Sequence, residues 1–128
     1  MNILGNAESL RARRALLRTA PAPQPRHDAV VILEHDGLGA VLRLRYVPDR
    51  DVLVPESLAE YVRTLSDMTF ASFEETAQTI LEDINDQVIP SWVEVTLRQT
   101  AEGMHHEVRI EDRQPGWHDR GLLDRLTP

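Results

Sequence analysis

The stretch that decides the fold runs from Asp49 to Trp92 and reads DRDVLVPESLAEYVRTLSDMTFASFEETAQTILEDINDQVIPSW. It predicts two helices in succession, because apolar residues recur in it at spacings of three and four and so share one helix face. In the first helix these residues are Leu58, Tyr61, Val62 and Leu65, and in the second they are Phe73, Ala77, Ile80, Leu81 and Ile84.

The start of the second helix has a signal of its own. Ser72 followed by Glu75 has the spacing of a capping box. In such a box, the side chain of each of the two residues accepts a hydrogen bond from the backbone N–H of the other. Both helices carry one apolar and one charged face, so the pair needs a sheet to cover it. The segments on either side are expected to supply that sheet.

Before the helices, the chain predicts a β-hairpin. Residues 29–33 form an apolar, mostly β-branched run that predicts a strand buried on both sides or at an interface. Asp36-Gly37 predicts the turn. Residues 40–46 then alternate, with Arg43 and Arg45 on the face opposite the apolar side chains. These arginines are expected to form a solvated face or an intersubunit row of ion pairs.

After the helices, Pro90 ends the second one, and residues 92–100 and 105–111 alternate as two further strands around a turn at 101–103. The order strand, strand, helix, helix, strand, strand predicts an α+β protein. Its antiparallel four-stranded sheet would carry both helices on one face. Such a sheet has open edges, which invite pairing with other subunits.

The N-terminal part looks separate from this unit. Residues 7–18 predict a short basic amphipathic helix that frays or docks on a neighbouring subunit, with an anion-binding arm as the less favoured alternative. Pro21-Ala22-Pro23-Gln24-Pro25 predicts a spacer. The expected division is therefore residues 1–26, a basic helix with a proline-rich arm, and residues 27–128, the folded domain with a C-terminal tail. In that tail, Trp117 is expected to act as an anchor.

Composition excludes several classes of function. The 128 residues contain no cysteine, which removes disulfides, thiolate metal sites and cysteine nucleophiles. The formal net charge of −7 argues against binding to nucleic acids or anionic membranes. No apolar run is long enough to span a bilayer and no secretory signal is evident, so a cytoplasmic location is expected.

Four short motifs resemble those of one family. They are Arg45-Tyr46-Val47-Pro48-Asp49, Ser57-Leu58-x-x-Tyr61, Phe73-x-Glu75 and Pro90-x-Trp92-Val93-Glu94-Val95. With these motifs, the chain from about Leu38 to Trp117 is similar to the NADPH-dependent nitrile reductases that convert 7-cyano-7-deazaguanine (preQ0), the precursor of queuosine, to its aminomethyl form. These enzymes have the tunnelling fold (T-fold), shared with GTP cyclohydrolase I and dihydroneopterin aldolase. The resemblance implies a ββααββ subunit that assembles into a homo-oligomer with sites at subunit interfaces.

The family's chemistry is not retained at the matching positions. Its nucleophilic cysteine would fall near Val30 or Val31, and its assisting aspartate near Leu38. A thioimidate needs a thiolate nucleophile, which valine cannot supply. The resemblance implies NADPH as cofactor, but the family's glutamate and two lysines correspond here to Val54, Glu56 and Ala59. Ordinary preQ0 reduction is therefore not expected, and no catalytic residue is assigned.

One element of the family's site does match. Tunnelling-fold proteins hold a purine, 7-deazapurine or pterin-like ring through a glutamate, whose two oxygens accept two adjacent N–H donors. Glu75 matches that glutamate, or Glu74 does if the longer preceding segment shifts the alignment; otherwise Glu74 takes the place of the family's histidine. Glu75 in a capping box needs no ligand, so a non-catalytic oligomeric scaffold or regulatory protein remains the alternative. A cyclohydrolase-like enzyme is a weaker third hypothesis, because that family's zinc-binding cysteines are absent.

The histidines predict no metal site. His105 and His106 are adjacent on a predicted strand and face opposite sides, so they cannot jointly bind one ion. Glu107 and His118 are the nearest further ligands in the sequence. Surface histidines are the expected outcome.

Overall fold

The computed structural model describes residues 3–23 and 28–128. Ten elements follow one another along the chain, and most of them form a single layered unit. They are α1 (Ile3–Ala15), β1 (Thr19–Pro21), β2 (Val31–Gly37), β3 (Ala40–Val47), β4 (Asp51–Leu53), α2 (Pro55–Ser66), α3 (Phe73–Val88), β5 (Trp92–Ala101), β6 (Met104–Arg113) and α4 (Arg120–Asp124).

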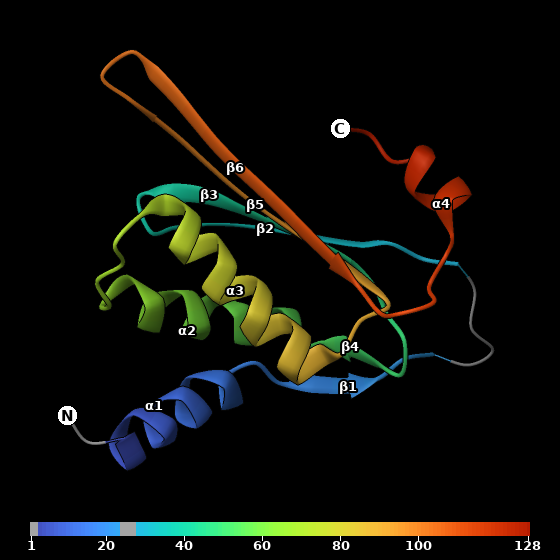
Figure 1. Cartoon of the computed structure of the whole chain (residues 1–128), viewed down its shortest axis with the longest axis horizontal. Helices are drawn as coiled ribbons and strands as arrows, with labels where there is room; N and C mark the ends of the chain where they lie inside the picture. The colour runs from blue at the N-terminus through green and yellow to red at the C-terminus, as the bar shows by residue number, and fades with distance from the viewer. Residues whose placement is uncertain (1–2, 24–27) are drawn as a thin grey trace.

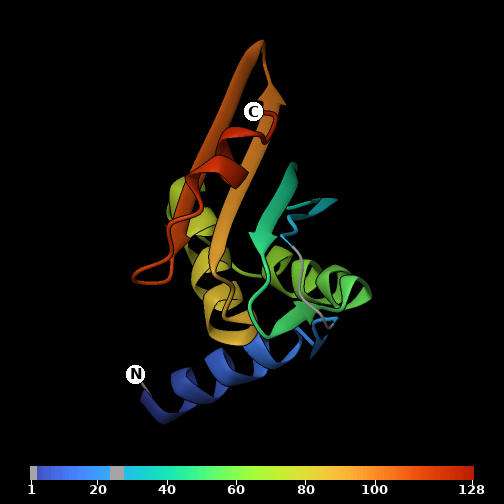
Figure 2. The same cartoon turned by 90° about the vertical axis from the view of Figure 1, so that its right-hand side faces the viewer.

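A four-stranded antiparallel sheet in the order β2-β3-β5-β6 forms the centre of the molecule. Helices α2 and α3 cover one face of this sheet, and α4 lies on the other side (Figure 1). The predicted α+β order of two strands, two helices and two strands is thus confirmed. The β5–β6 hairpin projects beyond the other strands in both views (Figures 1 and 2). The outer strands β2 and β6 leave their far edges without a neighbour within the part of the chain that is described.

The two helices form for the reasons read from the sequence. In α2, the buried face consists of the four predicted residues and Ser57. Helix α3 begins after Ser72, whose Oγ accepts the Glu75 N–H at 3.1 Å, so the Ser72 side of the predicted capping box is present. Together with the inward residues of β3 and β5, these faces make one core around the fully buried Tyr61, Leu65, Ile80 and Ile84.

The first hairpin turns two residues later than predicted. The turn residues are Leu38 and Gly39, with φ of 60° and 66°, while Asp36 and Gly37 still belong to β2. Gly37 serves helix packing instead, because a Cβ there would lie 2.5 Å from Cγ1 of Val62 in α2. Gly37 is therefore required by the packing of α2 on β2 and not by the turn.

Strand β2 also corrects a prediction. It is an outer strand with alternating exposure, and Ile32 is 50% exposed, so the run at 29–33 is not buried on both sides within this chain. The alternative of an interface strand stays a prediction.

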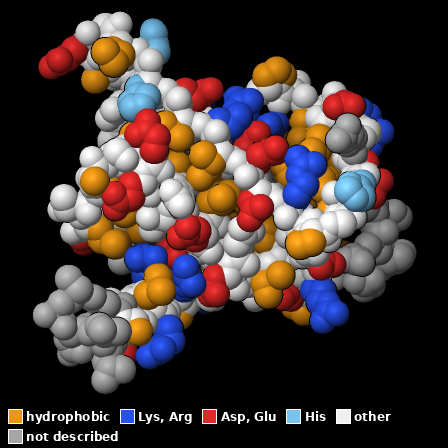
Figure 3. All heavy atoms as spheres, viewed as in Figure 1, with side chains coloured by type: hydrophobic (Ala, Val, Ile, Leu, Met, Phe, Trp, Pro, Cys, Tyr) orange, Lys and Arg blue, Asp and Glu red, His pale blue; other side chains and the backbone are white. Residues whose placement is uncertain are grey.

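The N-terminal segment packs on its own chain, contrary to the expectation that it frays or docks on a neighbouring subunit. Arg13 and Arg14 of α1 bind Asp83 of α3, and β1 pairs with β4. Basic side chains gather where α1 meets α3 (Figure 3). The boundary proposed between residues 26 and 27 falls outside the described residues, and the division into two parts stays a prediction.

The C-terminal segment, residues 114–128, lies over the sheet face opposite α2 and α3, which we call the outer face. Leu122 packs with Val47 and Trp92, and Trp117 joins the same cluster, consistent with its expected role as an anchor. Because of this cover, Arg45 is only 4% exposed. The expectation of a solvated arginine face is therefore wrong for Arg45.

Candidate functional site

The start of α3 holds both glutamates that the sequence singled out. Glu75 is exposed, and its Oε2 accepts the backbone N–H of Ala71 at 3.2 Å. The Glu75 N–H bonds Ser72 as in a capping box, but the return bond comes from Ala71, one residue before the N-cap. In this single chain Glu75 therefore caps its helix at the surface and does not point into an enclosed cleft.

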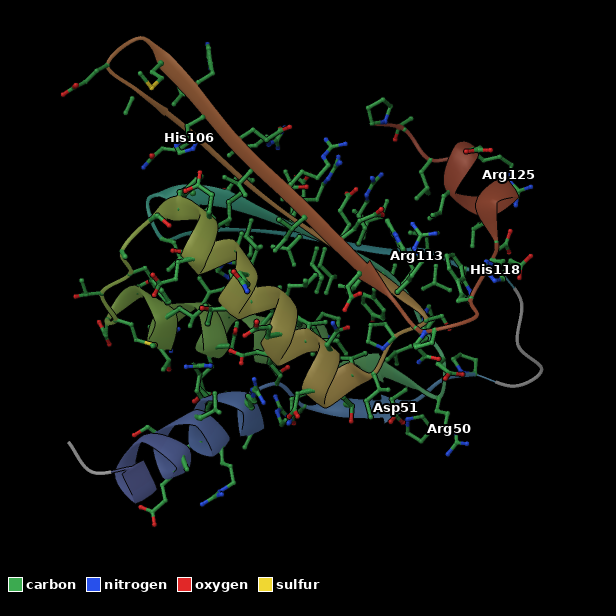
Figure 4. All side chains as sticks on the ribbon, in the orientation of Figure 1. Arg50, Asp51, His106, Arg113, His118 and Arg125 are labelled. Carbon is green, nitrogen blue, oxygen red and sulfur yellow. The ribbon has the colours of Figure 1, made fainter. Side chains whose placement is uncertain are left out.

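Glu74 lies beside a histidine from a distant part of the chain. His106 of β6 places Nε2 3.4 Å from Oε1 of Glu74, and its ring centroid lies 4.8 Å from that of Phe73. Figure 4 shows His106 on the projecting hairpin above the beginning of α3. The helix-start backbone N–H and then His106 lower the pKa of Glu74. No local pattern predicts this pairing, because only the β5–β6 register brings His106 over α3.

Two hollows flank this cluster. An open depression of about 630 Å³ lies at the far end of the sheet, lined by Val41, Gln99, Thr100 and His105 with His106. A smaller hollow of about 190 Å³ lies between the C-terminal end of α2 and the start of α3, with Phe70 and Phe73 in its wall. The Phe73–His106 pair thus connects the two hollows, because His106 lines the first and Phe73 lines the second. We call Phe73, Glu74, Glu75 and His106 the α3 cluster.

The positions that matched the family's cofactor segment hold no cationic side chain. Val54 and Ala59 are half-buried, and Glu56 is exposed in the first turn of α2. Phosphate groups need donors or positive charge, and a carboxylate opposes them. Leu38, which matched the assisting aspartate, lies in the β2–β3 turn and packs against the core.

A buried carboxylate that sequence reasoning missed lies elsewhere. Asp83 in α3 is 0% exposed and accepts hydrogen bonds from Arg13, Arg14 and Tyr61. Burial acts to raise the pKa of Asp83, but these bonds outweigh it, and the pKa is lowered. Burial, and then the charge of Asp83, raise the pKa of Tyr61. All four groups satisfy one another, so this cluster joins α1 to the helix pair and offers no open coordination position.

The remaining histidines do not assemble into a site. Across residues 3–23 and 28–128, no group of three His, Asp or Glu side chains is arranged to hold a metal ion. His105 bonds Thr100 at 3.0 Å, and His118 is exposed in the C-terminal segment (Figure 4). In the same described part, no helix combines the length and apolar character needed to cross a membrane.

Comparison with known proteins supports the fold. No family model matches the chain, and no curated protein matches it. Among solved structures, the crystal structure of the archaeosine synthase QueF-Like in the apo form superposes with a TM-score of 0.59. The identity is 23%, and the match covers 67% of this chain and 95% of the other. The chain has the tunnelling fold of that protein.

Proposed function

We propose, from this shared tunnelling fold, that the chain is the subunit of a homo-oligomer that binds a planar purine, 7-deazapurine or pterin-like ring through Glu75 or Glu74. The observation that carries the proposal is the α3 cluster. His106 contacts both the Glu74 carboxylate and the Phe73 ring and lines an open depression, and the exposed Glu75 is the next residue of the helix. A ring with two adjacent N–H donors matches a carboxylate, and its π-face matches the Phe73–His106 pair.

The cap on Glu75 does not oppose ring binding strongly. Its bond to the Ala71 N–H is exposed and long at 3.2 Å. Exposed hydrogen bonds of this kind contribute about 1 kcal/mol or less, because water replaces them. Two charge-assisted bonds to a ring exceed that cost once water is excluded. Glu74 is 63% exposed at its side chain, and it would have to leave the helix-start N–H and His106.

A second copy is required to exclude that water. The 630 Å³ depression is open, and ligand sites bury most of their ligand. Strands β2 and β6 both end the sheet with an unshared edge, so β6 of one copy is suited to pair with β2 of the next. Such a pairing places the neighbour's chain beside His106, which lies on β6.

Three variants test the proposal together with the ring panel. Sedimentation velocity establishes the oligomer, and calorimetric titration with 7-cyano-7-deazaguanine, guanine and neopterin measures binding. We expect micromolar binding of one ring that Glu75→Gln or Glu74→Gln weakens at least tenfold. Glu82→Gln is the matched control, since Glu82 is exposed on the same helix and bonds only Gln78 among the described residues. A monomeric protein, or a loss equal in all three variants, would contradict the proposal.

The second candidate function is a non-catalytic oligomeric scaffold or regulatory protein. The observation that favours it is the pair of bonds that Glu75 makes at the start of α3, which accounts for Glu75 without a ligand. An intact oligomer that binds none of the three rings would establish this alternative. Under either function, we expect no NADPH-dependent nitrile reduction, because no cysteine is present to form the thioimidate.

A further inference from the structure

We propose that the outer face of the sheet carries a second binding site, for a carboxylate group, formed by Arg43 and Thr96 beneath the C-terminal segment. The strand register places these residues side by side. Arg43 of β3 is directly opposite Thr96 of β5 and Glu34 of β2. Side chains opposite each other on one face have Cβ atoms about 5 Å apart. The hydroxyl and the guanidinium therefore share one patch of the outer face.

The polar atoms of this patch are buried without partners. Arg43 Nε, Arg43 Nη2 and Thr96 Oγ1 are inaccessible to solvent, and no described residue forms a hydrogen bond with them. Thr96 is 1% exposed, so water does not replace the missing partner from the surface. Buried polar groups in folded proteins are nearly always hydrogen-bonded, so three such atoms at one point indicate a missing acceptor.

The two arginine nitrogens are the pair that binds a carboxylate. Nε and Nη2 lie along one edge of the guanidinium, with parallel N–H donors that match two carboxylate oxygens. The same molecule shows this arrangement elsewhere. Arg13 donates from Nε and Nη2 to the two oxygens of Asp83 at 2.8 and 2.9 Å. Arg43 presents the same edge, and Thr96 adds a hydroxyl donor beside it.

The neighbouring carboxylates are committed to other arginines. Oε1 of Glu94 is 2.7 and 2.8 Å from two nitrogens of Arg45, but 3.8 Å from Nη2 of Arg43. Glu34 is half-exposed and reaches 4.0 Å from Arg98. None of these side-chain carboxylates bonds the Nε–Nη2 edge of Arg43. A carboxylate bound at that edge would pair with the arginine charge, which a neutral ligand does not do.

The C-terminal segment covers this site. The oxygens of Thr127 and Pro128 accept from Arg45 at 2.6 Å and from Arg43 Nη1 at 3.4 Å. Leu122, at 9% exposure, is the most buried side chain of residues 117–128 among those described, and Trp117, Leu123 and Leu126 pack beside it. The ligand therefore has to displace this cover, which competes with it for Arg43. Arg43 and Thr96 do not belong to the α3 cluster, so the two sites share no side chain.

The test follows the Arg43 Nε–H signal by NMR in the ¹⁵N-labelled full chain, with acetate, succinate or inorganic phosphate added at constant ionic strength. We expect a saturable shift with the two carboxylates. Thr96→Val, which keeps the side-chain shape, should weaken binding at least threefold, and Arg43→Gln should remove the signal. Arg98→Gln is the matched control on the same face and should leave the affinity unchanged. Leu122→Ala should tighten binding by loosening the cover.

Each contrary result has a defined meaning. No response of Arg43 in the folded wild type would overturn the proposal. A response that appears only in Glu34→Gln would also overturn it, because Glu34 would then be the natural occupant. Tighter binding of phosphate than of either carboxylate would contradict the assignment to a planar carboxylate. An unchanged affinity in Leu122→Ala would contradict the role of the C-terminal segment as a cover.

Discussion

Replacing Asp83 with asparagine should destabilise this protein severely and release α1. Asp83 is fully buried, and its carboxylate is the common acceptor for Arg13, Arg14 and Tyr61, at 2.8 to 2.9 Å for the arginine bonds. Asparagine keeps the volume but removes the charge and turns one acceptor oxygen into a donor that faces cationic nitrogens.

The size of this effect follows from burial. Removing one partner of a buried ion pair costs about 3–5 kcal/mol, since the other charge stays desolvated. Here the arginine side chains keep 15% and 22% exposure and can regain some hydration, so we expect about 3 kcal/mol. Asp86→Asn is the matched control. Asp86 is on the same helix and pairs with Arg14 at 3.4 Å, but it is 46% exposed, so about 0.5 kcal/mol is expected.

Equilibrium unfolding in urea at fixed protomer concentration measures both variants, and amide hydrogen exchange of residues 7–15 reports whether α1 stays docked. Asp83→Asn should speed exchange throughout α1, while Asp86→Asn should not. Equal stability of the two variants would refute the claim that one buried carboxylate holds α1 on the helix pair. Equal stability would also favour the predicted division of the chain into residues 1–26 and 27–128.

Three further outcomes follow from the same structure. Thr96→Val should raise the free energy of unfolding by about 1 kcal/mol, because it removes a buried hydroxyl without a partner; a loss of stability in urea would show that the hydroxyl is satisfied. Gly37→Ala should lower the free energy of unfolding by about 1–3 kcal/mol, because its Cβ would lie 2.5 Å from Val62. Gly121→Ala, with its nearest contact at 3.9 Å, should leave stability unchanged. Equal thermal midpoints of the two variants would contradict this account. The pKa of Asp83 is lowered by folding, so its stabilisation is present above about pH 4 and is lost as the pH falls through the lower folded value. Acid unfolding should therefore be less steep in Asp83→Asn, and an unchanged pH profile would disprove the linkage.

The layered core was predictable because it depends on local periodicity. The apolar faces of α2 and α3 and the bond from the Glu75 N–H to Ser72 follow from residues within one element, and the structure has both. Burial in β5 does not alternate, because its residues 92–97 are buried on both faces. The first turn lies two residues later than the sequence predicts, and tertiary packing is the reason. Asp36-Gly37 is a good local turn signal, but Gly37 is needed where α2 approaches β2, which moves the turn to Leu38-Gly39.

The clusters were not predictable, because they join residues far apart in the chain. In the sequence, Asp83 is one of several charged residues of α3. Only the packing of α1 against α3 brings arginines to it. Arg45 alternates like a surface residue, yet the C-terminal segment buries it. His106 meets Glu74 only through the register of the β5–β6 hairpin. Periodicity gives the side of an element on which a residue lies, but not what covers that side.

The most direct test of ring binding uses the Ala71 amide. Its N–H is donated to Oε2 of Glu75, so a ring that takes both oxygens of Glu75 must release it. We predict that saturating the oligomer with the ring that binds best shifts the Ala71 amide NMR signal and speeds its hydrogen exchange, and that the His106 ring signals shift with it. If the titration releases heat but the Ala71 and His106 signals stay unchanged, the ring binds elsewhere. That result would contradict the central claim.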